Sequence, residues 1–187
     1  MATGYYPASC VTEVGEHACD ACPTNEHGRI RGAGFIHSSY YSTIAADPLN
    51  SSLWTTGLDA GASGIINLPE TEGEMATPSP VTRTGFGDTS EFLIGFDFEV
   101  TFRDPNYIDN CDFWNSLNNA RGLYYFYYRT ETQTYISDKP VTVVAAPQIE
   151  NDDQSLVLWN VSAKWRSLNV PCNYTTIPIL RTCWVNN

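Results

Sequence analysis

The run of residues from Phe92 to Arg103 constrains the fold of this chain more than any other feature. It alternates between an apolar face and a polar face: Phe92, Ile94, Phe96, Phe98, Val100 and Phe102 form the first, and Asp97, Glu99, Thr101 and Arg103 the second. This alternation predicts a long, half-buried β-strand. Such a strand has unpaired backbone groups along both sides, so the rest of the chain or another copy must supply its neighbours.

The segments that follow predict an antiparallel arrangement of strands with one helix. A helix is expected from Asp109 or Asn110 to Arg121, with Gly122 as its left-handed stop. Three further strands are expected, in residues 123–131, in residues 135–145 with a break at Asp138–Pro140, and in residues 156–166. The connections are short enough for antiparallel neighbours. The predicted fold class is therefore mainly β: a twisted antiparallel β-sandwich or open barrel with one flanking α-helix.

The segments that precede the long strand are less regular. Arg29–Ile44 is β-prone and predicts a strand with a bulge or bend, and Ala62–Leu68 predicts a short strand. Asn50–Gly57 predicts a short helical turn around Trp54. Residues 70–90 contain few apolar side chains and predict a long exposed loop, of a length that is usually functional or becomes ordered against a partner.

The length and composition predict one structural domain with two appendages. A chain of 187 residues with 13 % aromatic residues is long enough for one well-buried core and too short for two comfortable domains. We assign residues 1–28 to a Cys-rich N-terminal arm, residues 29–170 to a β-sandwich assembly domain, and residues 171–187 to a C-terminal tail.

The charge limits the interactions with nucleic acid. A formal net charge of -11 argues against binding of nucleic acid through its phosphate groups, because such contacts need Lys and Arg. It does not argue against a place beside DNA, since a surface past which a polyanion slides should itself be acidic. The chain has neither a secretory signal nor an apolar run that could cross a membrane, so we expect it to be made and kept in a cytoplasm.

The N-terminal arm contains the residues that could bind a metal ion. Five potential ligands occur within 18 residues, namely Cys10, His17, Cys19, Cys22 and His27, and the pair Cys19 and Cys22 has the spacing of a short zinc knuckle. No second knuckle of the usual spacing accompanies it. A structural zinc ion is one interpretation. Reduced thiols in an acidic arm are the interpretation that we favour, and we predict no cofactor.

The chain contains no catalytic motif, so we predict no enzyme activity and assign no catalytic or cofactor-binding residue. The carboxylate pair Asp97 and Glu99 would suit glycoside chemistry, but an ordinary solvated strand face has the same pattern. His37 has no carboxylate or nucleophile at a recognisable offset. The aromatic run Tyr124–Tyr128 could stack on sugars, but burial of one face and a subunit contact on the other are favoured.

Several stretches together resemble a family of phage proteins. They are Asn67–Gly73, Gly85–Ser90, Phe102–Asn106, Phe113–Asn115, Tyr128–Glu131, Ile136–Pro140 and Trp159–Trp165. Over about residues 29–170 the chain is similar to small virion structural proteins of tailed phages, in particular the ring or tail-tube-like proteins of crAss-like phages of Bacteroides hosts.

This resemblance implies a virion protein that is made in the cytoplasm of a host bacterium. It would form a homo-oligomeric ring in the connector or tail, against neighbouring ring, portal or tail proteins, and DNA would pass through its lumen during ejection without specific binding. No membrane partner is implied. The alternative from another class is a carbohydrate-binding or receptor-binding β-sandwich that stacks sugars on Trp and Tyr. An enzyme that uses Asp97, Glu99 or His37 is a distant third.

Overall fold

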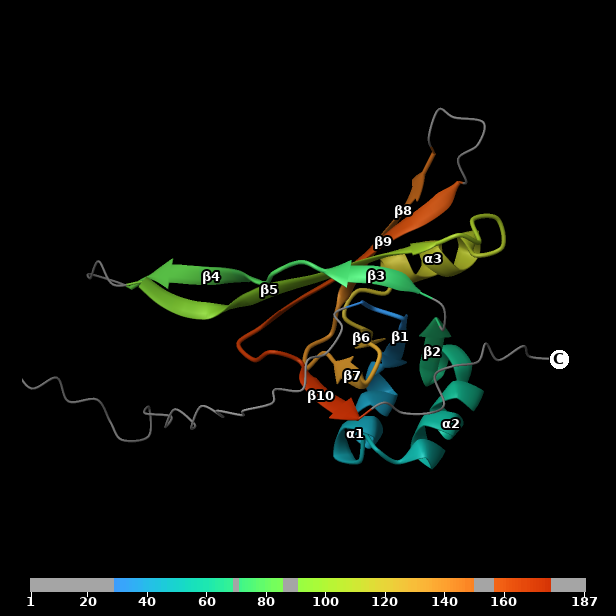
Figure 1. Cartoon of the computed structure of the whole chain (residues 1–187), viewed down its shortest axis with the longest axis horizontal. Helices are drawn as coiled ribbons and strands as arrows, with labels where there is room; N and C mark the ends of the chain where they lie inside the picture. Colours follow the sequence, from blue (N-terminus) through green and yellow to red (C-terminus); the bar gives the residue numbers. More distant parts are fainter. Residues whose placement is uncertain (1–28, 69–70, 86–90, 150–156, 176–187) are drawn as a thin grey trace, which may run out of the picture.

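The computed structural model describes residues 29–68, 71–85, 91–149 and 157–175 (Figure 1). The described part is 48 % strand and 23 % helix, in two antiparallel sheets and three α-helices. The prediction of a mainly β fold is therefore confirmed, while the prediction of a single helix is wrong.

The first sheet has five strands in the order β10-β7-β6-β1-β2. Every described pairing in it is antiparallel. Its strands are β1 (Gly32–His37), β2 (Ile65–Leu68), β6 (Tyr124–Arg129), β7 (Gln133–Ile136) and β10 (Cys172–Thr175). Strand β10 lies at the start of the predicted C-terminal tail, so that part of the tail belongs to the sheet.

The second sheet has the order β3-β5-β9-β8, and β4 also pairs with β5. Its strands are β3 (Glu72–Met75), β4 (Ser79–Thr84), β5 (Glu91–Asp104), β8 (Thr142–Gln148) and β9 (Leu158–Ser167). Residues 70–90 were expected to form a loop, and this expectation is wrong for the part described, because β3 and β4 both pair with β5. The sequence pattern does not reveal β3 and β4 because they contain few apolar side chains and form by backbone pairing with β5.

The main core lies between the two sheets. Side chains from both inner faces pack there together with Trp114 and Leu117 of helix α3 (Cys111–Asn119). Phe126 of the first sheet stacks on Phe102 of the second with ring centroids 6.1 Å apart. Phe98 and Trp165 of the second sheet stack at 5.2 Å. The two sheets therefore form a sandwich that is held mainly by aromatic burial.

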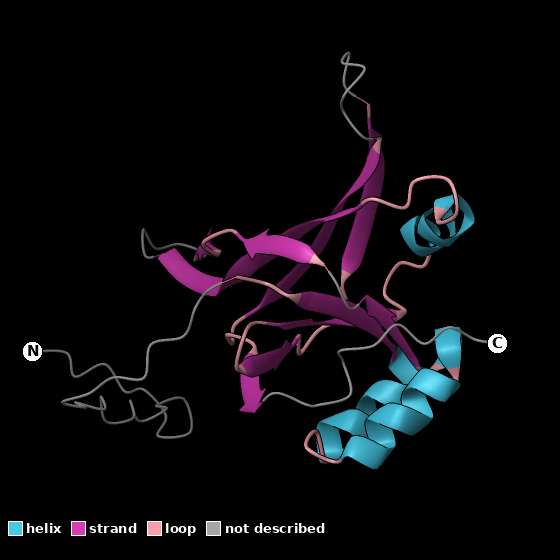
Figure 2. Ribbon diagram, turned by 45° about the vertical axis from the view of Figure 1, so that its right-hand side comes forward, coloured by secondary structure: helices cyan, strands magenta, loops and turns pink. Residues whose placement is uncertain are grey.

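A second core lies on the other face of the first sheet, under helices α1 (Ser38–Ala46) and α2 (Ser51–Asp59) (Figure 2). Trp54 of α2 packs edge-on against Tyr127 of β6 at 5.3 Å, and both side chains are fully buried. Tyr127 faces this core whereas Phe126 and Tyr128 face the sandwich. Both faces of this strand are therefore covered within the chain.

The two helices before β2 differ in how well the sequence predicted them. Helix α2 matches the expected turn around Trp54 and is longer; it is followed by a 3₁₀ turn, Gly61–Ser63. Helix α1 replaces the second half of the strand expected over Arg29–Ile44, so that expectation is wrong beyond His37. The His37 side chain accepts from the backbone N–H of Ser39, which caps the helix and ends β1.

Both sides of β5 have partners within the chain. Strand β9 covers residues 96–104 on one side, and on the other side β4 covers 91–97 and β3 covers 100–103. An isolated bridge from Ile30 to Gly73 also links the segment before β1 to β3. Of the two sources of neighbours that the sequence left open, the chain itself therefore supplies both at residues 96–97 and 100–103.

The outer edge of β8 is partly blocked by helix α3. The Asn118 side chain donates to the carbonyl of Ala145 at 2.9 Å and accepts from its N–H at 2.7 Å. Two residues further on, Pro147 has no N–H to offer. A side-chain clamp and an edge proline both oppose the addition of another strand here.

Candidate functional site

The carboxylate pair Asp97 and Glu99 is engaged in ion pairs across the outer face of the second sheet. Arg166 of β9 donates to both oxygens of Asp97, at 2.6 and 2.9 Å. Lys164 lies 2.9 Å from Glu99, and Ser162 donates to the same oxygen at 2.7 Å. The hydrogen bond from Arg166 lowers the pKa of Asp97, and those from Lys164 and Ser162 lower the pKa of Glu99. The pair thus has the geometry of cross-strand ion pairs.

His37 has a structural role at the start of α1. Its Nδ1 lies 2.7 Å from the Ser39 hydroxyl, and its ring packs edge-on against Tyr124 at 5.3 Å. Neither Asp97 nor Glu99 shares a hydrogen bond, ion pair or pocket with it. The residues proposed for an enzyme are not brought together.

The aromatic run Tyr124–Tyr128 does not form an open platform. Phe126, Tyr127 and Tyr128 are buried, and Tyr125 stacks on Tyr41 of α1 with centroids 3.5 Å apart. Burial raises the pKa of the Tyr127 hydroxyl, which donates to Asn67 at 2.9 Å. The subunit contact expected on one face of this strand is wrong, because the chain's own helices occupy that face.

The predicted metal ligands Cys10, His17, Cys19, Cys22 and His27 lie outside the described residues. Within residues 29–68, 71–85, 91–149 and 157–175, no group of three or more His, Cys, Asp or Glu side chains could hold a metal ion. In the same part of the chain, no helix is long and apolar enough to cross a bilayer.

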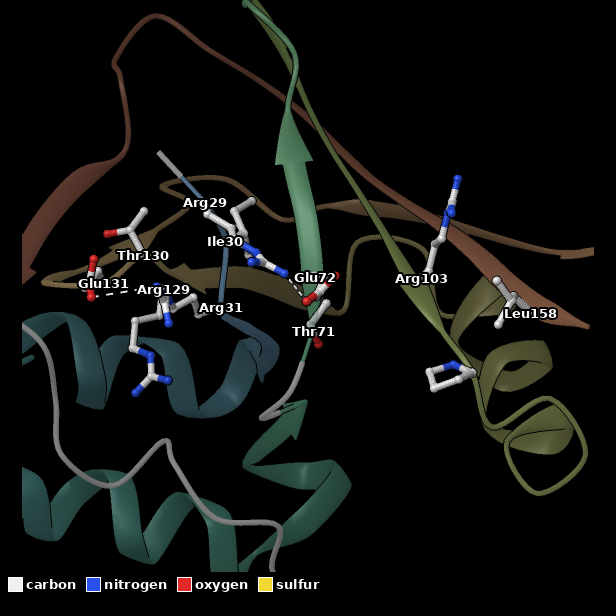
Figure 3. Close-up of a pocket in the computed structure, with 11 residues that line it drawn as sticks. Arg29, Ile30, Arg31, Thr71, Glu72, Arg103, Arg129, Thr130, Glu131 and Leu158 are labelled. Carbon is white, nitrogen blue, oxygen red and sulfur yellow. Dashed lines mark hydrogen bonds and ion pairs between the residues drawn. The ribbon is translucent and has the colours of Figure 1, made fainter. Parts of the chain in front are cut away.

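A hollow of about 850 Å³ opens where the two sheets meet, beside Ile30 and Thr71 (Figure 3). Four of the ten cationic residues of the chain line it, namely Arg29, Arg31, Arg103 and Arg129. Arg29 forms an ion pair with Glu72, and Arg31 lies 3.7 Å from Glu131. Arg103 lies at the far end and points away from Arg29 (Figure 3). Because two of the arginines are neutralised by carboxylates of the same hollow, we assign it no ligand.

The most unusual surface is a two-stranded arm formed by β4 and residues 91–95 of β5. Strand β9 ends opposite Phe96, so beyond that residue β5 pairs only with β4, and the arm projects from the sandwich (Figure 1). Phe92, Leu93 and Ile94 are 56 %, 46 % and 44 % exposed. Three consecutive large apolar side chains in solvent are typical of an interaction surface.

A β-bulge explains why the predicted alternation fails in the arm. Val81 pairs with Gly95 and Thr82 pairs with Leu93, which leaves Ile94 as an extra residue. Gly95 has a φ of +154°, and a Cβ there would lie 3.2 Å from the carbonyl oxygen of Ser167. The bulge changes the direction of the strand as it passes the end of β9. Phe92 and Ile94, which were expected on the core-facing side, therefore do not reach the core.

The apolar surface continues at the root of the arm. Leu168 and Val170 follow Ser167 directly and are 61 % and 69 % exposed. Ser167 pairs with Phe96, which places these residues next to the point where the arm begins. We call Phe92, Leu93, Ile94, Leu168 and Val170 the arm patch. The sequence did not reveal the arm patch, because Phe92 and Ile94 continue the apolar alternation of β5. Gly95 within that alternation is nevertheless a signal for a bulge.

Comparisons with known proteins do not add to these observations. No protein-family model, no curated protein and no solved structure matches the chain.

Proposed function

We propose that this chain is a structural protein of a bacteriophage virion, which forms a homo-oligomeric ring in the connector or tail around the DNA channel. The observation that carries the proposal is the projecting arm with exposed Phe92, Leu93 and Ile94. A protein whose main role is assembly needs a surface that is incomplete in the single copy, and the arm patch is such a surface.

The energetics of the arm favour a partner. Two-stranded ribbons are marginally stable in water, because they bury little apolar surface. Full burial of one Phe, Leu or Ile side chain stabilises by roughly 1.5–3 kcal/mol relative to full exposure. Three such residues that are each about half exposed could therefore gain several kcal/mol when a partner covers them.

The distribution of charge agrees with a ring around DNA. Counted along the sequence, the described residues hold 12 acidic and 9 basic side chains, a net charge of -3. The remaining segments hold 9 acidic side chains and 1 basic one, a net charge of -8, and the two parts together give the formal -11. In the proposed ring the acidic surplus of the chain faces the lumen, so that the genome slides past without adhering.

The carbohydrate-binding alternative loses its main support. The four tryptophans in the described part of the chain, Trp54, Trp114, Trp159 and Trp165, are all buried. A sugar platform needs an exposed aromatic face, and the aromatic run of β6 does not provide one. We therefore do not propose this function.

Electron microscopy of the purified full-length protein tests the proposal, together with sedimentation velocity over a range of concentrations. We expect closed rings with a central hole, in equilibrium with smaller species. A protein that stays monomeric at the highest concentrations and forms no ring in the particle that contains it would contradict the proposal. So would a ring whose channel is lined by Lys and Arg with the acidic segments outside.

A further inference from the structure

The arm has two open edges, whereas the other edges of the second sheet are partly blocked. No described strand pairs with the outer side of β4, or with the β9 side of β5 over residues 91–95. By contrast, Asn118 clamps β8 at Ala145, and Ile30 bridges to β3 at Gly73. Open backbone edges beside exposed apolar side chains are templates for the addition of a strand.

The proline of β4 shows which backbone groups point outward. Pro80 pairs with Phe96 and has no N–H, so it must occupy a position where its nitrogen faces away from β5. The extra residue of the bulge lies on β5, and β4 keeps its regular alternation. The N–H groups of Thr82 and Thr84 therefore also face outward, where a further strand could accept them.

We propose that the arms of adjacent copies pair edge to edge, with the outer edge of β4 in one copy against residues 91–95 of β5 in the next. This inference rests on the proposed ring and identifies the contact that closes it. The occupant of the arm patch is a second copy of this chain.

Two features favour this head-to-tail pairing. If adjacent copies are related by rotation about an axis parallel to the arms, β4 of one copy runs antiparallel to β5 of the next. That is the relative direction the two strands already have within the chain. Each arm has two different open edges, the outer edge of β4 and the β9 side of β5. A series of contacts that joins one to the other leaves no edge open only when it closes into a ring.

The pairing would also cover the arm patch. On one face Phe92 lies opposite Arg83, and on the other face Leu93 lies opposite Thr82. A neighbouring arm extends both faces, so that Phe92, Leu93 and Ile94 of one copy are flanked by the β4 side chains of the next across the new pair of strands. Leu168 and Val170 at the root would meet the neighbour's β4.

Two variants of the full-length chain test this pairing. Thr82→Pro removes an outward N–H of β4 without removing a bond to β5. Ile94→Lys places a charge in the arm patch on the other edge. The control is Leu49→Lys, which adds the same charge at a residue that is 60 % exposed and lies between α1 and α2. Near-ultraviolet circular dichroism and thermal unfolding verify the fold of each variant.

Sedimentation velocity then separates the possible modes of assembly. We expect each arm variant alone to assemble at least about 10-fold more weakly than the wild type, and the control to assemble like the wild type. A 1:1 mixture of Thr82→Pro and Ile94→Lys should form a dimer, because one partner keeps an intact β5 edge and the other an intact β4 edge.

Other outcomes overturn the inference. If Thr82→Pro forms dimers on its own, the contact joins two β5 edges about a two-fold axis. If the wild type forms rings and both variants form them equally well, the arm does not mediate assembly, but the proposed function stands. If the wild type forms no ring at any concentration or in its particle, the proposed function fails together with the inference.

Discussion

At the scale of single residues, Asp104 joins the end of β5 to the start of α3. One of its oxygens accepts from the indole N–H of Trp114 and from the side chain of Asn110, both at 2.7 Å, and the other accepts from the backbone N–H of Asn106 at 2.9 Å. Trp114 is fully buried, so its N–H has no access to water. The carboxylate therefore determines where the helix packs on the sandwich.

We expect Asp104→Ala to destabilise the fold by about 2–3 kcal/mol, since a buried N–H without an acceptor costs about 1–3 kcal/mol and two further bonds are lost. Urea unfolding followed by tryptophan fluorescence measures the change in the free energy of unfolding. Asp109→Ala in the same connection is the control, because Asp109 is exposed. A loss equal to that of the control would show that Trp114 finds another acceptor.

The ion pairs of Asp97 and Glu99 predict a dependence of stability on pH. Their pKa values are lowered in the folded chain from ordinary values of 3.8 and 4.5, so the two carboxylates stabilise the fold above those values. This contribution disappears as the pH falls through the lowered pKa values. Asp97→Asn/Glu99→Gln should therefore lose less stability than the wild type between about pH 6 and about pH 2.5.

Urea denaturation at the two pH values measures this difference, which should be small because both carboxylates are partly exposed. Asp59→Asn/Asp109→Asn removes two exposed carboxylates that form no ion pair with another described residue. Equal acid sensitivity in the wild type and in both double variants would show that the cross-strand pairs contribute nothing measurable.

At the scale of elements, Asn118 protects an edge of the second sheet. Its two bonds to Ala145 replace those that another strand would make. Asn118→Ala should cost about 1–2 kcal/mol and increase the rate of amide hydrogen exchange at Ala145 by at least about 10-fold. Among the described residues the neighbouring Asn119 donates to Asn115 of its own helix and not to β8, so Asn119→Ala is a matched control. Unchanged exchange at Ala145 would mean that the helix backbone blocks the edge without the side chain.

The sequence predicted the elements whose side chains alternate between core and solvent. Phe96, Phe98, Val100 and Phe102 identify β5, and the alternation from Trp159 to Trp165 identifies β9. Their periodicity is visible because one face of each strand packs in the sandwich. The helix around Phe113 and Trp114 was predicted from the same principle, with the end near Gly122, which has a φ of +72°.

The sequence did not predict elements that depend on backbone partners or local bonds. Strands β3 and β4 are mostly exposed, so their formation depends on β5, which lies elsewhere in the chain. Helix α1 contains Tyr40, Tyr41 and Thr43, which favour strands, and it forms because His37 caps it and Ile44 is buried. The arm patch was not predicted for a related reason: the apolar and polar alternation of β5 does not show where its neighbour β9 ends.

At the scale of the whole molecule, the chain divides into a body that is complete in one copy and an arm that is not. In the body, β5 has neighbours on both sides over residues 100–103 and its inner side chains are buried. In the arm, the same strand has one neighbour and exposed apolar residues. Local stability should follow this division, because opening is easiest where few apolar contacts are lost.

Hydrogen exchange at two protein concentrations tests this division in the wild type. In dilute protein, we expect the amides of residues 91–95 to exchange at least about 100-fold faster than those of residues 98–103. At concentrations where rings form, the arm amides should become protected, while those of the body should change little, since binding stabilises only the segments that it covers. Ile94→Lys should keep the fast exchange at both concentrations. Strong protection of the arm in dilute, monomeric protein would show that the ribbon is stable by itself, and the physical reason for its pairing with another copy would be lost.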